Sequence, residues 1–291
     1  MSGPKDEFVE VNGLRLHYRD WGGPGRPIVL LHGLASTSRI WDLVAPLLSQ
    51  DHAVVALDQR GHGESDKPDE GYDFATVGSD LHGFIQALGL ERPVIAGHSW
   101  GGDVALEHAV AYPGTASGLA LVDGGTIEIS SSIGSTLEEA KKVMAPPDFT
   151  GTTIDDFVGM VRSRPFAVEM TDTIEQIVLS NFEVLDDRTI RARLSRRNHI
   201  QIIEAFWNHR PSKLYASVRC PVLLMPARQP NAQIPQAAMG FDREEAISIA
   251  RKLLPVSETV WLEDSIHDVP IQRPELVASV ISGRIEAGFF G

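Results

Sequence analysis

The sequence is poor in the features that define several common classes of protein. Cys220 is its only cysteine, so no disulfide can form within the chain. No window of about 18 apolar residues is present, and a helix that crosses a membrane would need one. Residues 1–7 lack the apolar core of a signal peptide, and we therefore expect a cytoplasmic protein.

Positive charge is also scarce in this chain. Lys and Arg together number 26, against 39 Asp and Glu, which gives a net charge of −13. Non-specific binding to nucleic acid or to anionic membranes needs a basic surface, so we expect neither as a partner. No Cys/His spacing typical of a metal site is present, and no metal or organic cofactor is expected.

What the sequence does contain is a regular alternation of buried strands and helices. Its 291 residues, 43% of them apolar, are enough for one large α/β domain or two smaller ones. Residues 8–18 alternate apolar and polar around Asn12-Gly13, which predicts a hairpin. Apolar runs at 27–31, 53–57, 94–96 and 118–122 are separated by helical patterns. This order predicts an α/β fold: a mostly parallel sheet of about eight strands with helices on both faces.

The pattern changes between residues 126 and 212. Helical spacing, for example at Ile154, Phe157 and Val161, replaces the buried strands. The strand–helix order then resumes with the apolar run at 222–225. We therefore predict a core domain formed by residues 1–125 and 213–291, with an all-helical cap, or lid, at 126–212.

The first indication of a catalytic site is the strand-to-helix junction Gly97-His98-Ser99-Trp100-Gly101. The pattern Gly-x-Ser-x-Gly is typical of a turn so sharp that its central serine is strained and exposed above the sheet. Glycine two positions away on either side lets the chains pass. The alternative is a chance Gly/Ser turn, but the strand before it and the helix after it favour Ser99 as a nucleophile.

A serine nucleophile needs a base within hydrogen-bond reach. Because functional groups gather beyond the carboxyl ends of parallel strands, we predict His267, which closely follows the apolar run at 259–262. We predict a packing role for His98, which sits inside the turn, a loop-shaping role for His62 and a turn-stabilising role for His32.

An acid must then hold the base in the correct tautomer. No carboxylate occurs in residues 226–233, after the run at 222–225, and Asp242 is too far along to be presented there. Asp123 stands directly after the preceding strand, so we predict it as the acid. The alternative is that Asp123 only caps a turn and that no third member exists.

Acyl transfer also needs donors for the oxyanion. We predict the backbone N–H of Trp100, directly after the nucleophile, and that of Leu34 in the turn after the first buried strand. Gly33 in that turn lets the backbone approach a substrate.

These motifs together resemble the α/β-hydrolase superfamily over essentially the whole chain. The resemblance rests on Leu30-Leu31-His32-Gly33, the run from Asp58 to Ser65, Gly97 to Gly102, and His267-Asp268-Val269-Pro270 followed by Arg273-Pro274-Glu275. It implies Ser99 as nucleophile, His267 as base and a cap of helices over the site.

The acid departs from the usual pattern of that superfamily. Most members carry it after the strand equivalent to 222–225, whereas some haloalkane dehalogenases and zearalenone-type lactone hydrolases carry it one strand earlier, where Asp123 lies. Because Ser99 replaces the aspartate nucleophile of dehalogenases and epoxide hydrolases, neither of those activities is expected here.

The leading hypothesis is a serine hydrolase that cleaves a small carboxylic ester or lactone through an acyl-enzyme. The alternatives on the same three residues are a C–C bond hydrolase and a cofactor-free perhydrolase; a slow-turnover ligand-binding receptor of this fold is the alternative from another class. The cap and the loop at 226–239 are expected to select the substrate, and the oligomeric state is open. Candidate substrate-binding residues are Gly33, Val158, Met160, Ile177, Phe182, Phe206 and Trp207.

Overall fold

The computed structural model describes residues 3–134, 136–163, 168–228 and 242–291. From residue 229 onward, the loop that we expect to select the substrate lies outside the described residues. No helix in these ranges is both long and apolar enough to cross a membrane.

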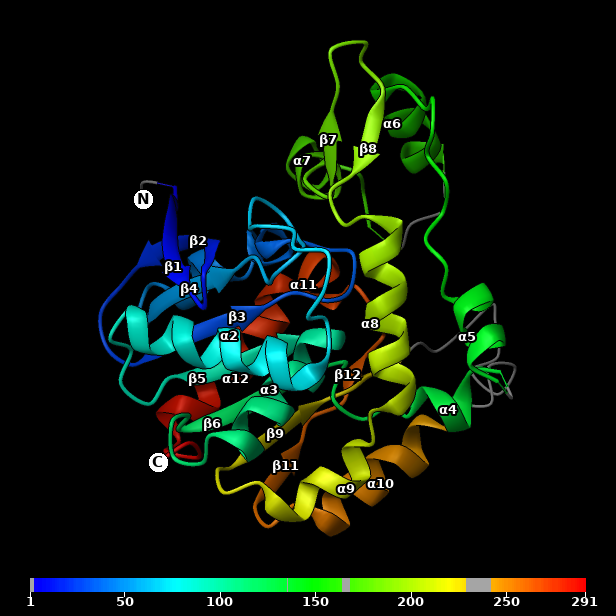
Figure 1. The fold of residues 1–291 in the computed structure, drawn as a ribbon. Helices are drawn as coiled ribbons and strands as arrows, with labels where there is room; N and C mark the ends of the chain where they lie inside the picture. Colours follow the sequence, from blue (N-terminus) through cyan, green and yellow to red (C-terminus); the bar gives the residue numbers. More distant parts are fainter. Residues whose placement is uncertain (1–2, 135, 164–167, 229–241) are drawn as a thin grey trace.

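A central eight-stranded sheet in the order β1-β2-β4-β3-β5-β6-β9-β11 confirms the predicted architecture (Figure 1). The hairpin β1–β2 is antiparallel and joins β4 in antiparallel fashion, while every other neighbouring pair is parallel. The strands are β1 (Lys5–Val11), β2 (Leu14–Gly22), β3 (Pro27–Leu31), β4 (Ala53–Leu57), β5 (Val94–His98), β6 (Gly118–Val122), β9 (Val222–Met225) and β11 (Ser257–Thr259).

Hydrophobic clusters cover both faces of the sheet. Successive strand residues point to opposite faces, so in β3 Val29 and Leu31 join one cluster while Ile28 and Leu30 join the other. This double burial explains why the run at 27–31 is continuously apolar. The first cluster includes side chains of α2 (Phe74–Ala87), α3 (Trp100–Ala111), α8 (Arg196–Asn208) and α10 (Arg243–Leu253). The second includes side chains of η1 (Ser38–Trp41), α1 (Ala45–Leu48), α11 (Val269–Gln272) and α12 (Pro274–Glu286).

The predicted strand at 259–262 is divided in the structure. β11 ends at Thr259 in the main sheet, whereas β12 (Leu262–Glu263) pairs in parallel with β10 (Ala227–Arg228) in a small separate sheet. This small sheet extends beyond the end of β9 and leads the chain directly toward His267.

The segment between 126 and 212 is not all-helical, and the prediction is wrong on this point. It contains α4 (Ile129–Ser132), α5 (Leu137–Val143), α6 (Ile154–Ser163), α7 (Asp172–Leu179) and α8, but also the hairpin of β7 (Phe182–Val184) and β8 (Ile190–Ala192). The hairpin escaped detection because its strands are short and mostly exposed. Its turn contains no glycine, and Arg188 takes the positive φ of 65°.

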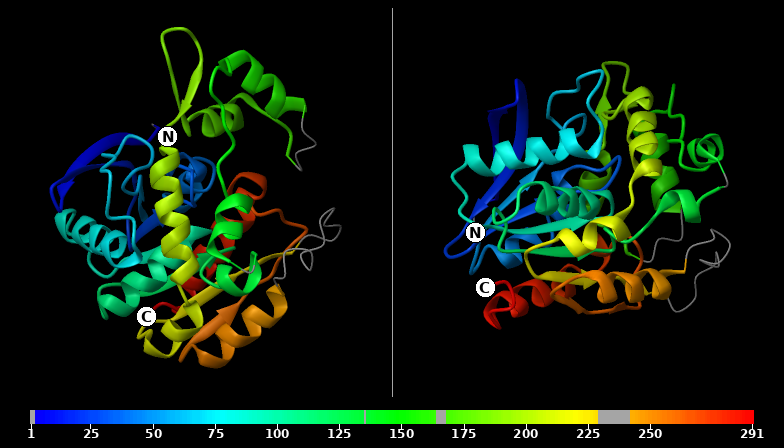
Figure 2. Two further views of the ribbon diagram at one scale, coloured as in Figure 1. Left: turned by 45° about the vertical axis from the view of Figure 1, so that its right-hand side comes forward. Right: turned by 60° about the horizontal axis from the view of Figure 1, so that its bottom comes forward.

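The hairpin, α6 and α7 form a group that stands away from the sheet, as Figures 1 and 2 show. This group has its own hydrophobic cluster, in which the Phe157 and Phe182 rings pack edge to face with their centroids 4.6 Å apart. α8 instead runs beside the core and adds Ile202 and Phe206 to the main cluster. The boundaries at 126 and 212 stay a prediction. After α8 come α9 (Pro211–Leu214) and η2 (Tyr215–Ser217), which lead back to β9.

Candidate active site

The candidate site lies where the parallel strands end. The N–H of Ser99, which follows β5, donates to the Val122 carbonyl at the end of β6, at 3.0 Å. The N–H of Asp123 donates to the Met225 carbonyl at the end of β9, also at 3.0 Å. Adjacent strand ends therefore hold the predicted nucleophile and the predicted acid side by side.

The turn at Ser99 has the strained geometry that its spacing predicts. Ser99 takes φ 52° and ψ −126°, a combination that non-glycine residues rarely adopt. A Cβ on Gly97 would lie 2.2 Å from the Gly101 carbonyl oxygen, and one on Gly101 would lie 2.7 Å from that of Leu31. Both glycines are therefore required by close backbone contact.

Three side chains from distant parts of the sequence meet at this turn. His267 Nε2 lies 3.0 Å from Ser99 Oγ, and His267 Nδ1 lies 2.7 Å from Asp123 Oδ2. Because a carboxylate only accepts, Nδ1 carries the proton and Nε2 is left to accept the serine proton. This arrangement has the geometry of a nucleophile, a base and an orienting acid.

Asp123 is enclosed by the protein, and its side chain has other partners besides His267. Its side chain is 1% exposed, and its backbone takes a positive φ of 46°, which aspartate tolerates better than most residues. Oδ1 accepts from the Ala227 N–H at 2.9 Å and pairs with the Arg243 guanidinium. Sequence reasoning missed Arg243, since nothing local links it to a strand 120 positions earlier.

Asp242 does not approach this site through its carboxylate. It is the N-cap of α10, where its side chain accepts from the Glu245 N–H at 3.0 Å. Asp268, the residue directly after His267, is the N-cap residue of α11. Neither is the hydrogen-bond partner of the His267 ring.

His98 has a more defined place than the predicted packing role. Its side chain is buried, and Nε2 lies 2.8 Å from the backbone carbonyl of His267, so it donates there. Burial, with a contribution from His267, lowers the pKa of His98 to about 4, so the ring is neutral near pH 7. His98 thus fixes the backbone of the predicted base. The sequence does not predict this contact, because the two residues are far apart in the chain.

The pKa of His267 itself lies below its ordinary value of 6.5. Partial loss of hydration around the ring is the largest cause, and the positive charge of Arg243 adds to it, while the Asp268 carboxylate acts in the opposite direction. Both ring nitrogens have protein partners, yet the side chain remains 49% exposed, so the protein removes part of its hydration without enclosing it. His267 is therefore a neutral base near pH 7 that a substrate can reach.

The segments that carry the two predicted oxyanion donors both adjoin Ser99. Trp100 is the first residue of α3, where backbone N–H groups have no partner within the helix. On the other side, a Cβ built on Gly33 would lie 3.0 Å from Ser99 Cβ and 3.5 Å from Oγ, so the turn that contains Leu34 abuts the nucleophile.

Two buried histidines hold that turn in place, in agreement with their predicted roles. His32 Nδ1 donates to the Gly33 carbonyl at 2.8 Å, and its Nε2 accepts from the Gln59 N–H at 3.0 Å. His62 Nε2 accepts from the Ala35 N–H at 3.3 Å. Both rings are fully occupied by backbone groups and are therefore structural.

The candidate substrate-binding residues of the cap fall into separate places. Phe206 and Trp207 belong to the hydrophobic cluster that contains Trp100, and Ile177 is buried on α7. Val158 and Met160 instead lie within the hydrophobic group formed by α6, α7 and the hairpin, together with Phe182. Of the cap candidates, only the α8 aromatics therefore join the hydrophobic cluster of the core, which also contains Trp100.

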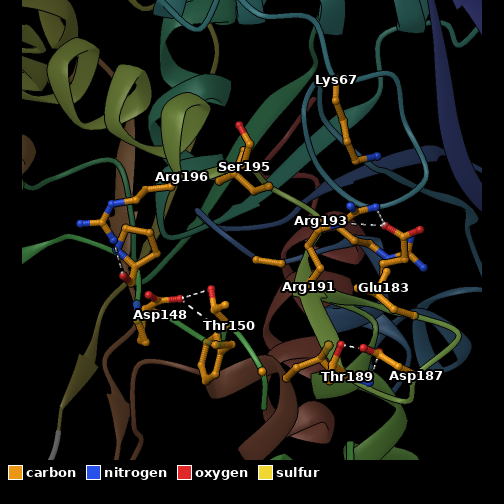
Figure 3. Close-up of a pocket in the computed structure, with 18 residues that line it drawn as sticks. Lys67, Asp148, Thr150, Glu183, Asp187, Thr189, Arg191, Arg193, Ser195 and Arg196 are labelled. Atoms are coloured by element: carbon orange, nitrogen blue, oxygen red, sulfur yellow. Dashed lines mark hydrogen bonds and ion pairs between the residues drawn. The ribbon is translucent and has the colours of Figure 1, made fainter. Parts of the chain in front are cut away.

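A cavity of about 1140 Å³ opens between the hairpin, residues 146–151 and the start of α8 (Figure 3). Its charged residues have protein partners: Lys67 Nζ donates to two backbone carbonyls at 2.8 Å, and Arg193 pairs with Glu64 at 2.7 Å. None of the three meeting side chains lines it. Within the described ranges, no group of three or more acidic, His or Cys side chains is arranged to hold a metal ion.

The fold and the strand-end site together define a class of protein. The sequence model of the alpha/beta hydrolase family matches residues 28–280, so the chain belongs to that family. In fold it is similar to E-2-(acetamidomethylene)succinate hydrolase, with a TM-score of 0.79, 22% identity, and 97% of this chain and 99% of the other covered.

Sequence similarity to individual relatives is limited to part of the chain. The soluble epoxide hydrolase of Corynebacterium sp. (strain C12) is 40% identical over 99 residues, 34% of this chain and 34% of the relative. The non-heme chloroperoxidase of Streptomyces lividans is 40% identical over 114 residues, 38% of this chain and 41% of the relative. The chain thus aligns with less than half the length of these curated relatives.

The close contact at Gly97 predicts a large loss of stability on adding one methyl group. We expect Gly97→Ala to lower the free energy of unfolding by about 3 kcal/mol, because the Gly101 backbone cannot move away without disturbing the turn. Gly283→Ala on α12 is the matched control: its Cβ meets nothing within 4 Å and should stabilise by about 0.5–1 kcal/mol. Urea unfolding measures both, and a Gly97→Ala protein as stable as the parent would contradict this view of the turn.

The contact between Ser99 and His267 predicts selective reactivity. A fluorophosphonate probe should label Ser99, as located by peptide mass spectrometry, and Ser99→Ala and His267→Ala should abolish labelling. Because protonated His267 cannot accept the serine proton, the labelling rate should fall as the pH drops through the pKa of His267. Since that pKa is lowered, the half-maximal rate should lie below pH 6.5. Labelling that is independent of pH between 5 and 8 would contradict this.

Proposed function

We propose that the protein is a serine hydrolase that cleaves carboxylic esters or lactones through an acyl-enzyme intermediate. The observation that carries the proposal is the continuous chain of contacts from Ser99 Oγ through His267 to the buried Asp123 carboxylate. A serine hydroxyl is a weak nucleophile by itself, and this arrangement supplies the base that it lacks.

In the first half of the reaction, Ser99 Oγ bonds to the carbonyl carbon while its proton passes to His267 Nε2. The resulting imidazolium lies against Asp123, whose negative charge stabilises it. The C–O bond to the leaving group then breaks, and the alkoxide takes the proton from Nε2.

In the second half, His267 removes a proton from water as the water oxygen attacks the acyl-enzyme. Collapse of that second intermediate returns the proton to Ser99 Oγ and releases the carboxylic acid. The N–H groups of Leu34 and Trp100 hold the negative oxygen in both halves, a contribution of the order of 10²–10³ in rate for each donor.

The aromatic side chains of α8 support an apolar acyl group. Phe206 and Trp207 of α8 share a hydrophobic cluster with Trp100, next to Ser99. We propose that these two aromatics contact the acyl chain and that α8 limits its length. Val158 and Met160 are left out of this pocket, because they pack within the hydrophobic group of the cap.

The similarity to an epoxide hydrolase does not extend to its activity in this proposal. The superfamily resemblance implies an aspartate nucleophile for epoxide opening, whereas a serine occupies the turn here. Serine favours acyl transfer, in which the intermediate is an ester that water can cleave at its carbonyl.

The nucleophile has a direct test. We expect Ser99→Ala to lower kcat/KM for a short-chain p-nitrophenyl ester by about 10⁵-fold, because no other group in the site can form the acyl-enzyme. Circular dichroism and thermal melting should match the parent. Unchanged release of p-nitrophenol from the folded variant would remove the proposal.

The acid is tested by a pair of matched variants. Asp123→Asn should reduce kcat by about 10⁴-fold with little change in KM, because the amide favours the wrong tautomer of His267. Asp242→Asn should stay within about twofold of the parent, since asparagine caps a helix as well as aspartate does. Activity that survives in the first variant and falls in the second would reassign the acid to Asp242.

A further inference from the structure

The Asp123 carboxylate has a cation on the oxygen that His267 does not use. Oδ2 is bound by the imidazole, whereas Oδ1 accepts from the Ala227 N–H and pairs with the Arg243 guanidinium. The Arg243 side chain is 16% exposed and the Asp123 side chain 1%, so this ion pair is largely shielded from water. Shielding makes its charges matter more than those of a surface pair.

Arg243 is held in this position by the start of its own helix. It is the first residue of α10, directly after the N-cap Asp242, whose side chain accepts from the Glu245 N–H. The next residue, Glu244, pairs with Arg228 at 3.0 Å. That pair is exposed, so the position of Arg243 depends on the shielded contact with Asp123 and on the helix start, and little on Arg228.

Charged groups reach the His267 ring from several elements. Asp123 contacts it from the end of β6, and the neutral His98 ring lies 4.9 Å away on the strand-to-helix turn. Asp268 is the next residue in the chain, and Arg243 acts from α10. Arg243 is the cation of this set, and it opposes the two carboxylates that favour a protonated ring.

We propose that Arg243 is a positioning residue of the site: it holds Asp123 in place and offsets part of its negative charge, so that His267 works as a base at lower pH. This proposal rests on the proposed function for its effect on turnover. The lowered pKa of His267, to which Arg243 contributes, is in keeping with it. The proposed orienting acid, which follows β6, thus receives a stabilising cation from α10.

The test compares two variants at position 243. Arg243→Gln keeps a hydrogen-bond donor for Asp123 but removes the charge, whereas Arg243→Lys keeps the charge. The measurement is the pH profile of kcat/KM for p-nitrophenyl acetate. In Arg243→Gln the midpoint of its acid limb should move to higher pH by about half a unit or more. At a pH well below that midpoint, kcat/KM should therefore fall at least about threefold further, relative to the parent, than it does at the plateau. Arg243→Lys should keep the midpoint of the parent.

Arg228→Gln is the matched control. Arg228 pairs with Glu244 and Glu263 at the surface and makes no side-chain contact with Asp123 among the described residues. Removing the Arg228 charge should leave the midpoint of the acid limb unchanged. A purely structural role for Arg243 would lower the plateau of both Arg243 variants and move neither midpoint, which would overturn the proposal. So would an equal shift in Arg228→Gln.

A second readout needs no substrate and separates this proposal from the proposed function. NMR titration of the His267 ring in Ser99→Ala protein should give a higher pKa when Arg243→Gln is added. A shift in this titration without esterase activity in the parent would refute ester hydrolysis and keep the role of Arg243. An unchanged His267 titration would overturn the role of Arg243 whatever the activity.

Discussion

A carboxylate taken out of water must be given hydrogen-bond donors or positive charge in place of its hydration. Asp123 is in that position, with a side chain that is 1% exposed. The fold supplies it with a backbone N–H from Ala227, a ring N–H from His267 and the guanidinium of Arg243. In the proposed mechanism, the orientation of His267, and with it the reactivity of Ser99, depends on this one buried group.

The scaffold brings Ser99, Asp123 and His267 together through hydrogen-bonded strand ends. Parallel strands β5, β6 and β9 end side by side, and backbone hydrogen bonds join Ser99 and Asp123 to the neighbouring strand ends. The small sheet of β10 and β12 extends the edge and leads the chain to His267. His98 then fixes the His267 backbone from within the turn itself. Ser99, Asp123 and His267 therefore each follow a strand end or a segment that leads from one.

Sequence reasoning was strongest where the signal is local. Five consecutive residues define the turn at Ser99, and continuous apolar runs define the buried strands. Asp123 followed from topology, because it directly succeeds a strand and the next strand end has no carboxylate. The contacts of His98 and Arg243 join segments that are far apart in the sequence, and no local pattern predicts them. The cap hairpin was missed because its mostly exposed strands lack the apolar run by which buried strands are recognised.

The central claim is that a buried acid at the end of β6 orients the base for a serine nucleophile. A crystal structure of the protein with a phosphonate ester on Ser99 tests it most directly. The account predicts that the phosphonyl oxygen lies within hydrogen-bond distance of the Leu34 and Trp100 N–H groups, with His267 Nδ1 still on Asp123. A phosphonylated protein in which the His267 ring has turned to a different carboxylate, with Asp123 left to Arg243 and Ala227, would contradict it.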